Sequence, residues 1–294
     1  MSTVAYEIVD VFTDRPFAGN PLAVVFGAQA LGGDQLQALA REFNLSETVF
    51  VLPPSDPAGG ATYRARIFTP ETELPFAGHP SVGAAVTATR RGLFEPGELV
   101  QECGAGLLPV RVTAEGSATL TGGTPTLGEP LDGGPLLTMA GLTDADAAEP
   151  PASARRAGCG LEFVYLPVRR AALADAAVVA ADARRLGVSQ IDVFAWDPAT
   201  RTAYSRVFCP GVAVPEDPAT GSAALGLGVW LVAAGWLPAD GTSRYTVHQG
   251  VEMRRPSVLE CTVTADAGVA SVATVSGHVV PVARGEIAVP PFIG

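Results

Sequence analysis

Apolar and polar positions along the chain follow two periods, which predict many short strands and a few helices. Strand-like runs, rich in β-branched residues, are bounded by glycine, proline and aspartate. These runs cover residues 5–12, 22–26, 47–52, 62–68, 98–102, 107–113, 162–168, 191–196, 203–208, 245–252, 257–264, 268–275 and 278–283. Helix-like runs cover residues 34–43, 80–91, 182–187 and 223–234. The mixture predicts an α+β fold.

The chain also matches itself when it is shifted by 143 residues, which predicts two similar lobes. A chain rich in glycine and alanine can match itself by chance, but an ordered set of identities within one short window argues against chance. The identical pairs are Glu73 and Glu216, Pro75 and Pro218, Gly78 and Gly221, Gly83 and Gly226, Val86 and Val229, and Gly92 and Gly235.

We assign the N-terminal lobe to residues 1–120 with 281–294, and the C-terminal lobe to residues 121–280. The segment 121–135 is rich in glycine and proline, so we expect the chain to cross between the lobes there. In each lobe, a curved mixed sheet is expected to wrap around one central helix of small apolar residues.

The two central helices are expected to begin and end alike. His79 followed by Pro80 predicts a helix N-cap and a proline at the first helical position. Ser222 takes the N-cap place in the second copy, and serine is a favoured cap. Gly92 and Gly235 follow the two helices and predict their C-terminal ends.

The starts of these helices are the first candidate site. Unpaired N–H groups and a partial positive charge favour anions at a helix N-terminus. If the lobes face each other by pseudo-symmetry, the amides near Gly78 and Gly221 would meet in one cleft and bind a small carboxylate. A plain helix start is the alternative interpretation of each motif.

Three titratable side chains stand at these starts, one at the first motif and two at the second. His79 is one of only three histidines and falls at the first motif, whereas most lone histidines are structural. Glu216 aligns with Glu73, which indicates a shared structural role. Asp217 aligns with Leu74, so this acid has no counterpart in the other copy and is the better candidate for a specific function.

Glu47 is a third candidate, because it opens an apolar run that continues through Val49 and Val51. A carboxyl group on an apolar strand face is costly to bury, and burial raises its pKa toward the range of a general base. The alternative is an edge-strand glutamate that points to solvent. Glu162 is a possible counterpart in the second lobe, and we do not expect it to be catalytic.

Composition narrows the class of protein. The 294 residues carry a net charge of −11, so a nucleic-acid-binding face and attraction to an anionic membrane are not expected. All 19 basic residues are arginine, and the absence of lysine excludes pyridoxal-phosphate, Schiff-base and Walker-A chemistry. Residues 218–238 hold no charge, but three glycines in their apolar part, Gly226, Gly228 and Gly235, favour a buried helix over a membrane span.

Cofactors and targeting signals are not expected either. The four cysteines are far apart, and no motif for a nucleotide or a metal is present, so we predict no cofactor and no metal. The N-terminus reads as a strand and not as a signal peptide. We therefore expect a reduced, cytoplasmic protein.

Several motifs together resemble the phenazine-biosynthesis isomerase family (PhzF type). The resemblance spans nearly the whole chain. Its motifs are Phe17-Ala-Gly-Asn-Pro-Leu-Ala-Val24, Phe43-Asn-Leu-Ser-Glu-Thr48, Phe68-Thr-Pro70, Glu73-Leu-Pro-Phe-Ala-Gly-His-Pro80, Gln101-Glu-Cys-Gly-Ala-Gly106, Pro215-Glu-Asp-Pro-Ala-Thr-Gly-Ser-Ala223, Gln249-Gly250 and Arg255-Pro-Ser257.

The resemblance implies a diaminopimelate-epimerase-like fold, a homodimer, and a cofactor-independent isomerase acting on trans-2,3-dihydro-3-hydroxyanthranilate or a similar small carboxylate. It implies that Glu47 is the acid and base and that His79, Asp217 and Ser222 bind and polarise the substrate. Further substrate-binding residues would be Asn20, Gly78 and Gly221.

Two alternatives remain open. One is a binding or interaction protein on the same scaffold, without turnover. The other is an epimerase, although the related epimerases place a cysteine at each of two opposed turns, and neither turn here carries one.

Overall fold

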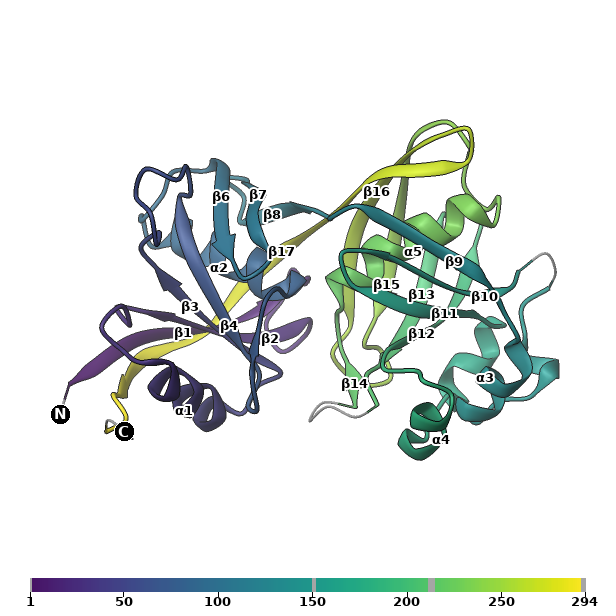
Figure 1. Ribbon diagram of the computed structural model, residues 1–294, viewed down its shortest axis with the longest axis horizontal. Helices are drawn as coiled ribbons and strands as arrows, with labels where there is room; N and C mark the ends of the chain where they lie inside the picture. Colours follow the sequence, from purple (N-terminus) through teal and green to yellow (C-terminus); the bar gives the residue numbers. More distant parts are fainter. Residues whose placement is uncertain (1, 150–151, 211–214, 292–294) are drawn as a thin grey trace. The chain divides into compact units, whose positions relative to one another are not determined.

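The structure is a computed structural model that describes residues 2–149, 152–210 and 215–291 (Figure 1). The chain divides into two compact units, Met1–Thr121 with Ser276–Gly294, and Gly122–Val275. The return to the first unit comes at residue 276, earlier than the expected 281. The reason is strand β17 (Val269–Ala288), which continues without a break where the sequence pattern predicts two strands.

The first unit is a sheet around helix α2 (Gly78–Arg90). That helix packs against strands on several sides, including β1, β2, β3, β7 and β8. Helix α1 (Gly33–Phe43) packs instead against β3 and β4. The strands are β1 (Thr3–Val11), β2 (Asn20–Phe26), β3 (Glu47–Leu52), β4 (Tyr63–Phe68), β5 (Glu73–Leu74), β6 (Gly97–Cys103), β7 (Gly106–Val112), β8 (Ser117–Thr121) and the C-terminal part of β17.

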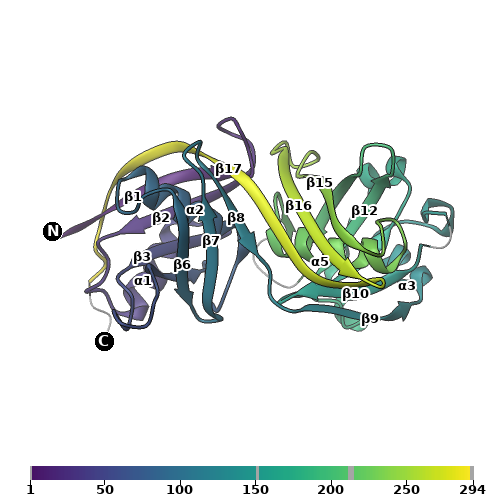
Figure 2. The same cartoon turned by 90° about the horizontal axis from the view of Figure 1, so that it is seen from above.

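The second unit repeats this plan around helix α5 (Gly221–Ala233), which packs against β9, β10, β11 and β16 (Figure 2). Its strands are β9 (Pro125–Leu131), β10 (Ala154–Cys159), β11 (Glu162–Pro167), β12 (Ile191–Asp197), β13 (Thr202–Phe208), β14 (Glu216–Asp217), β15 (Gly241–Gln249), β16 (Ser257–Asp266) and the first part of β17. Its other helices are α3 (Gly133–Met139), α4 (Ala180–Arg185) and the 3-10 turns η1 (Asp144–Asp146) and η2 (Arg170–Asp175).

The expected crossing over residues 121–135 is shorter than predicted. Strand β9 already belongs to the second unit and pairs with β10, and α3 follows it directly. Only residues 122–124 separate β8 from β9. Gly122 and Gly123 lie in this crossing, whereas the other glycines and prolines of the segment lie in the exposed strand β9 and in the first turn of α3.

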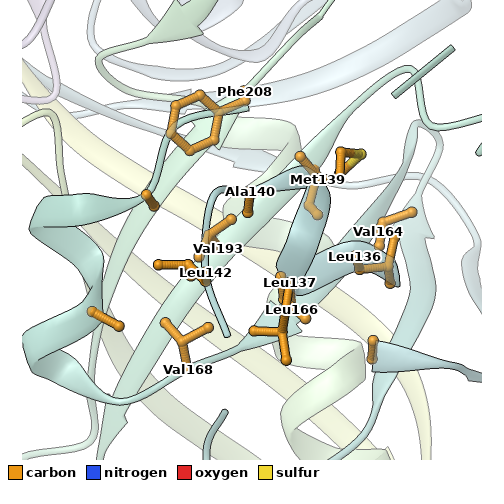
Figure 3. Close-up of a cluster of buried hydrophobic side chains, with 14 of the residues drawn as sticks. Leu136, Leu137, Met139, Ala140, Leu142, Val164, Leu166, Val168, Val193 and Phe208 are labelled. Carbon is orange, nitrogen blue, oxygen red and sulfur yellow. The ribbon is translucent and has the colours of Figure 1, made fainter. Parts of the chain in front are cut away.

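A cluster of apolar side chains covers the face of the second unit's sheet that points away from α5. Figure 3 shows Leu137 of α3 beside Leu166 of β11, and Val193 of β12 beside Ala140 and Leu142, which follow α3. Successive residues of a strand point to opposite faces. Because Val193 joins this outer cluster, its neighbour Phe194 faces inward, where its ring meets Trp230 of α5 in an edge contact.

Both central helices begin two residues earlier than predicted. The N-caps are Ala77 and Thr220, so His79 and Ser222 are the second helical residues, and the prediction that they are N-caps is wrong. Pro80 is accordingly the third helical residue. The first N–H groups of a helix have no partner within the helix, so a proline there costs no hydrogen bond.

The predicted ends of these helices are confirmed. Gly92 and Gly235 follow the C-caps of α2 and α5 with left-handed φ angles of 73° and 71°. The N–H of Gly92 donates to Thr89, and the N–H of Leu93 donates to Ala88 at 3.1 Å. This pair of bonds is the Schellman motif, in which glycine has no Cβ to clash.

Glycines on α5 make room for two buried tyrosines. The hydroxyl of Tyr165 lies against Gly226 and donates to the carbonyl of Ala223 at 2.7 Å. The hydroxyl of Tyr245 lies against Gly228 and donates to the next carbonyl along the helix. The absence of side chains at these glycines lets the strands approach the helix closely. No helix among the described residues is long and apolar enough to cross a membrane.

Candidate active site

The short strands β5 and β14 lead into the two helices in the same register. Glu73 pairs with Phe68 of β4, and Glu216 pairs with Phe208 of β13. Each glutamate accepts two hydrogen bonds from one arginine. Arg66 donates to Glu73 at 2.8 and 2.7 Å, and Arg206 donates to Glu216 at 2.8 and 2.9 Å. Both glutamates therefore have the structural role that the repeat predicts.

The two ion pairs differ in their surroundings. The side chain of Arg206 is 10% exposed and that of Arg66 is 21% exposed. Arg206 also donates to the carbonyls of Leu173 and Ala176, at 2.8 and 2.6 Å. The guanidinium of Arg206 thus ties β14 to the turn η2 as well as to its own strand.

His79 is buried in the first turn of α2, with 4% of its surface exposed. Burial disfavours the charged imidazolium and lowers the pKa of His79 to about 3. The ring is therefore neutral at physiological pH and carries one proton, on one of its two nitrogens.

A chain of side chains decides which ring nitrogen carries that proton. The hydroxyl of Ser46 donates to Oδ1 of Asn20 at 3.2 Å, which leaves the Asn20 amide NH2 facing Nδ1 of His79 at 3.2 Å. An amide NH2 only donates, so Nδ1 of His79 is the acceptor. The proton of the neutral ring is then on Nε2.

Nε2 of His79 points toward the carboxylate of Glu47. The distance from Nε2 to Oε2 of Glu47 is 3.7 Å, longer than a hydrogen bond, and Nε2 has no hydrogen-bond partner within the described residues. Glu47 is the first residue of β3, where it pairs with Leu22, and its side chain is 18% exposed. Val49 is fully buried on the same strand face, in agreement with the apolar face predicted for Glu47.

The second unit holds the other predicted site residues. Asp217 ends β14, and its Oδ2 accepts a hydrogen bond from the hydroxyl of Thr220 at 2.5 Å. Gly221 and Ser222 form the first turn of α5 and are buried. The predicted residues thus gather as two groups, with Asn20, Glu47, Gly78 and His79 in one unit and Asp217, Gly221 and Ser222 in the other.

The pairing registers show what is special about the second unit. When Arg66 and Glu73 of the first unit are matched with Arg206 and Glu216 of the second, the strands of the two units become equivalent: β4 to β13, β3 to β12 and β2 to β11. One row of side chains runs across the sheet toward the turn before each helix. The row is Val24, Val49, Ile67 and Leu74 in the first unit, and Tyr165, Asp192, Val207 and Asp217 in the second.

Asp192 therefore lies where the first unit has a valine. It is 1% exposed, and its Oδ2 accepts a long hydrogen bond of 3.4 Å from Ser205. Its Oδ1 has no hydrogen-bond partner in the part of the chain that the structure describes. Burial raises the pKa of Asp192 to about 7.

The proposed counterpart of Glu47 in the second unit is wrong. The same registers align Glu47 with Gln190, the residue before β12, whereas Glu162 opens β11. Glu162 is exposed and accepts a hydrogen bond from Thr126 at 2.8 Å. The apolar run after Glu162 is β11, which is equivalent to β2 and not to the strand β3 that carries Glu47. The residue pattern alone did not distinguish these two strands.

Sequence reasoning missed three residues of these sites. Ser46 and Gln249 lie in motifs that carry the family resemblance, but no role was assigned to either. Asp192 interrupts an apolar run, which is the same signal that identified Glu47. Within the described residues, no three His, Cys, Asp or Glu side chains gather in a way that could hold a metal ion.

Comparison with known proteins gives the class of protein. The family described as phenazine biosynthesis-like protein matches residues 9–285. An uncharacterized isomerase of Mesorhizobium japonicum is 36% identical, with 98% of this chain and 99% of that protein covered. The trans-2,3-dihydro-3-hydroxyanthranilate isomerase of Pseudomonas chlororaphis is 34% identical, with 96% and 98% covered.

A solved structure shares the fold. The crystal structure of a Bacillus anthracis phenazine biosynthesis protein of the PhzF family superposes with a TM-score of 0.87, at 24% identity, and covers 98% of this chain and all of that one. The chain belongs to the phenazine biosynthesis-like protein family. Its sheet-rich α+β fold is that of the PhzF proteins, and the class of enzyme is an isomerase of PhzF type.

Proposed function

We propose that this protein is a cofactor-independent isomerase that moves a proton between two carbons of a small cyclic or unsaturated carboxylate. A compound like trans-2,3-dihydro-3-hydroxyanthranilate is the expected substrate, because a 34% identical relative is named for that reaction. The observation that carries the proposal is the arrangement of Glu47, His79 and Asn20 in the first unit.

Glu47 acts as the base and then as the acid. An isomerisation of this kind needs one group that removes a proton from one carbon and returns it to another. Glu47 is partly exposed at the end of an apolar strand face, so its carboxylate can reach a substrate. No electron is gained or lost, because the electron pair released at the first carbon shifts through the double bonds to the second.

His79 stays neutral during this step. A low pKa keeps the ring from accepting the proton that Glu47 carries, so His79 is a hydrogen-bond donor rather than a competing base. Its Nε2–H is directed toward the Glu47 carboxylate and the space beside it. From there it can orient the carboxylate or polarise an oxygen or nitrogen of the substrate.

The second unit would supply the groups that bind the substrate. We propose that the starts of α2 and α5 face one cleft, where the amides near Gly78 and Gly221 and the hydroxyl of Ser222 bind the carboxylate. Asp217 would bind a polar group of the ring. A homodimer is also expected, on the family resemblance alone.

The test is turnover in heavy water. Purified protein is incubated with trans-2,3-dihydro-3-hydroxyanthranilate in D2O, and the product is analysed by NMR. We expect product to form, with deuterium at the carbon that receives the proton whenever Glu47 exchanges with solvent before it returns the proton. A ligand that binds without turnover, and without deuterium uptake, would contradict the proposal and favour a binding protein.

A thiol-based epimerase has less support. Cys159 and Cys261 are buried, and burial raises the pKa of both thiols, that of Cys159 to about 12. A thiol with a raised pKa is a poor source of thiolate at neutral pH. Neither cysteine lies in the turns that lead into α2 and α5.

A further inference from the structure

The turn that carries Asp217 is held by a buried glutamine from another strand. Gln249 ends β15 and is 1% exposed. Its Oε1 accepts from the backbone N–H of Thr220 at 3.0 Å. Its Nε2 donates to the backbone carbonyl of Asp217 at 2.7 Å and to the hydroxyl of Thr220 at 3.0 Å. One side chain thus joins both ends of the turn.

The residues around Gln249 close on the same turn. Gly250 has a φ of 75°, and a Cβ there would lie 2.6 Å from the carbonyl oxygen of Pro218. The hydroxyl of Ser257 donates to that same carbonyl at 2.8 Å. The backbone of the turn is therefore enclosed by a glutamine amide, a glycine and a serine hydroxyl.

The first unit has the glycine but not the glutamine. Strand β4 is equivalent to β13, and Arg64 is equivalent to Tyr204. Arg64 pairs with Glu102 of β6, and Tyr204 pairs with His248 of β15, so Glu102 is equivalent to His248. Cys103 therefore stands at the position of Gln249.

Gly104 packs against Pro75 as Gly250 packs against Pro218. There, the N–H of Ala105 donates to Pro75 at 3.1 Å, and a cysteine side chain cannot join both ends of a turn. Of these two turns, the one that begins at Asp217 is held by a glutamine, and the one that begins at Leu74 is not.

We propose that Gln249 is a positioning residue for Asp217, which fixes the backbone of the turn and thereby the place of the Asp217 carboxylate. This inference rests on the proposed function, in which Asp217 contacts the substrate. Thr220, whose hydroxyl donates to the Asp217 carboxylate, is bonded to Gln249 through both its N–H and its hydroxyl. The glutamine therefore acts on the Asp217 carboxylate through Thr220 and through the backbone carbonyl of Asp217 itself.

Loss of the amide would release the turn. The Thr220 N–H and the Asp217 carbonyl would be left in a partly buried place without these partners, and polar groups that are shielded from water and have no partner drive local rearrangement. A displacement of about 1 Å at a reacting group costs on the order of 10²-fold in rate.

Two substitutions test this role. Gln249→Met keeps the length of the side chain and removes both polar atoms. We expect its kcat/KM to fall roughly 10²-fold. Gln249→Glu keeps the acceptor for Thr220, and when its carboxyl is protonated it can also donate to the Asp217 carbonyl. Its activity relative to wild type should therefore recover as the pH is lowered, because burial raises the pKa of such a carboxyl.

Gln35→Met is the matched control. Gln35 is also a buried glutamine whose amide joins two backbone groups, accepting from Gly32 at 3.1 Å and donating to Pro290 at 2.7 Å, but it lies on the outer helix α1. We expect kcat/KM of this variant to stay near the wild-type value. Near-normal kcat/KM for Gln249→Met would overturn the inference. So would a Gln249→Glu activity that keeps a constant ratio to wild type at every pH.

Hydrogen exchange separates this inference from the proposed function. The amide of Thr220 should lose its protection in Gln249→Met and keep it in Gln35→Met, and this measurement requires no substrate. A wild-type protein without turnover would contradict the proposed function only, while unchanged protection of Thr220 would contradict the role of Gln249.

Discussion

Nε2 of His79 lies 3.7 Å from Oε2 of Glu47, although the two residues are on different elements, the first turn of α2 and the first residue of β3. The amide of Asn20, at the start of β2, donates a hydrogen bond to the other ring nitrogen, Nδ1. The neutral ring thus presents an N–H toward a carboxylate. Four predictions follow from this arrangement, from the burial of Asp192 and from the two Arg–Glu pairs.

Glu47→Gln is expected to abolish most turnover. The amide keeps the shape of the side chain but cannot carry a proton, so turnover should fall roughly 10²–10⁴-fold while ligand affinity changes little. The measurement is turnover and ligand affinity with a dihydro-hydroxyanthranilate substrate. The control is Glu162→Gln, which makes the same change at an exposed glutamate of the second unit, and this variant should have normal turnover. Normal turnover by Glu47→Gln would transfer the role to Asp217.

Asn20→Asp is expected to move the proton of His79. A carboxylate in place of the amide offers only acceptors to Nδ1, so the ring should carry its proton on Nδ1, and the pKa of His79 should rise toward its ordinary value. Nitrogen-15 NMR of the ring distinguishes the two tautomers. We expect a lower kcat, because the N–H directed toward Glu47 is lost.

Asn44→Asp is the matched control for that experiment. Asn44 is the exposed C-cap of α1, in a left-handed conformation that aspartate also tolerates. Its substitution should leave the ring spectrum of His79 unchanged. An unchanged His79 tautomer in Asn20→Asp would show that Asn20 does not set the state of the ring.

Asp192→Asn is expected to change how stability depends on pH. The pKa of Asp192 is raised to about 7 in the folded protein, from an ordinary value of 3.8, so the folded state keeps a proton that the unfolded state releases. The wild-type contribution is complete below about pH 4 and is lost as the pH rises toward 7. At one pKa unit per 1.36 kcal/mol, the loss is at most about 4 kcal/mol.

The free energy of unfolding of Asp192→Asn, minus that of wild type, should therefore increase from about pH 4 to pH 7. Denaturant unfolding at a series of pH values measures this difference. Since His79 is present in both proteins, its own opposite dependence on pH cancels in the difference. A difference that is independent of pH would mean that Asp192 titrates normally.

The two arginines of the ion pairs are expected to differ in importance. Arg206→Lys breaks a partly buried bidentate pair and leaves two backbone carbonyls without their donor, which should destabilise the protein by about 3 kcal/mol. Arg66→Lys affects a more exposed pair and should cost about 1 kcal/mol or less. Thermal or denaturant unfolding of the two variants compares them directly, and equal losses would contradict the argument from burial.

Much of the local structure was predictable from the sequence. The predicted strands and four helices are present, because apolar periodicity and terminal glycines are local signals. The 143-residue repeat correctly paired Glu73 with Glu216, since both bind an arginine of the preceding strand. The start of α2 was two residues off, because proline is tolerated throughout the first turn and so does not mark one position. The start of α5 was aligned with it through the repeat and was off by the same two residues.

The partners of the site residues were not predictable in the same way. The amide of Asn20 faces His79 across 59 positions of sequence, and Gln249 reaches the Asp217 turn across about 30. The positions that face each other across a sheet depend on the strand register, which no local pattern contains. Strands β9 and β10 were missed because their alternation of apolar and polar residues is weak or interrupted by glycine and proline. Strand β8 does alternate, but it is only five residues long and was missed for that reason.

From the sequence alone one can predict most of the elements, the repeat and the motifs that identify the family, and its lack of lysine excludes lysine chemistry. The tautomer of His79, the burial of Asp192 at the position equivalent to Val49, and the hydrogen bonds from Gln249 to its turn are visible in the folded chain alone. The physical reason is that propensity and periodicity act between near neighbours, whereas hydrogen-bond partners and desolvation are properties of groups that meet only when distant strands pair.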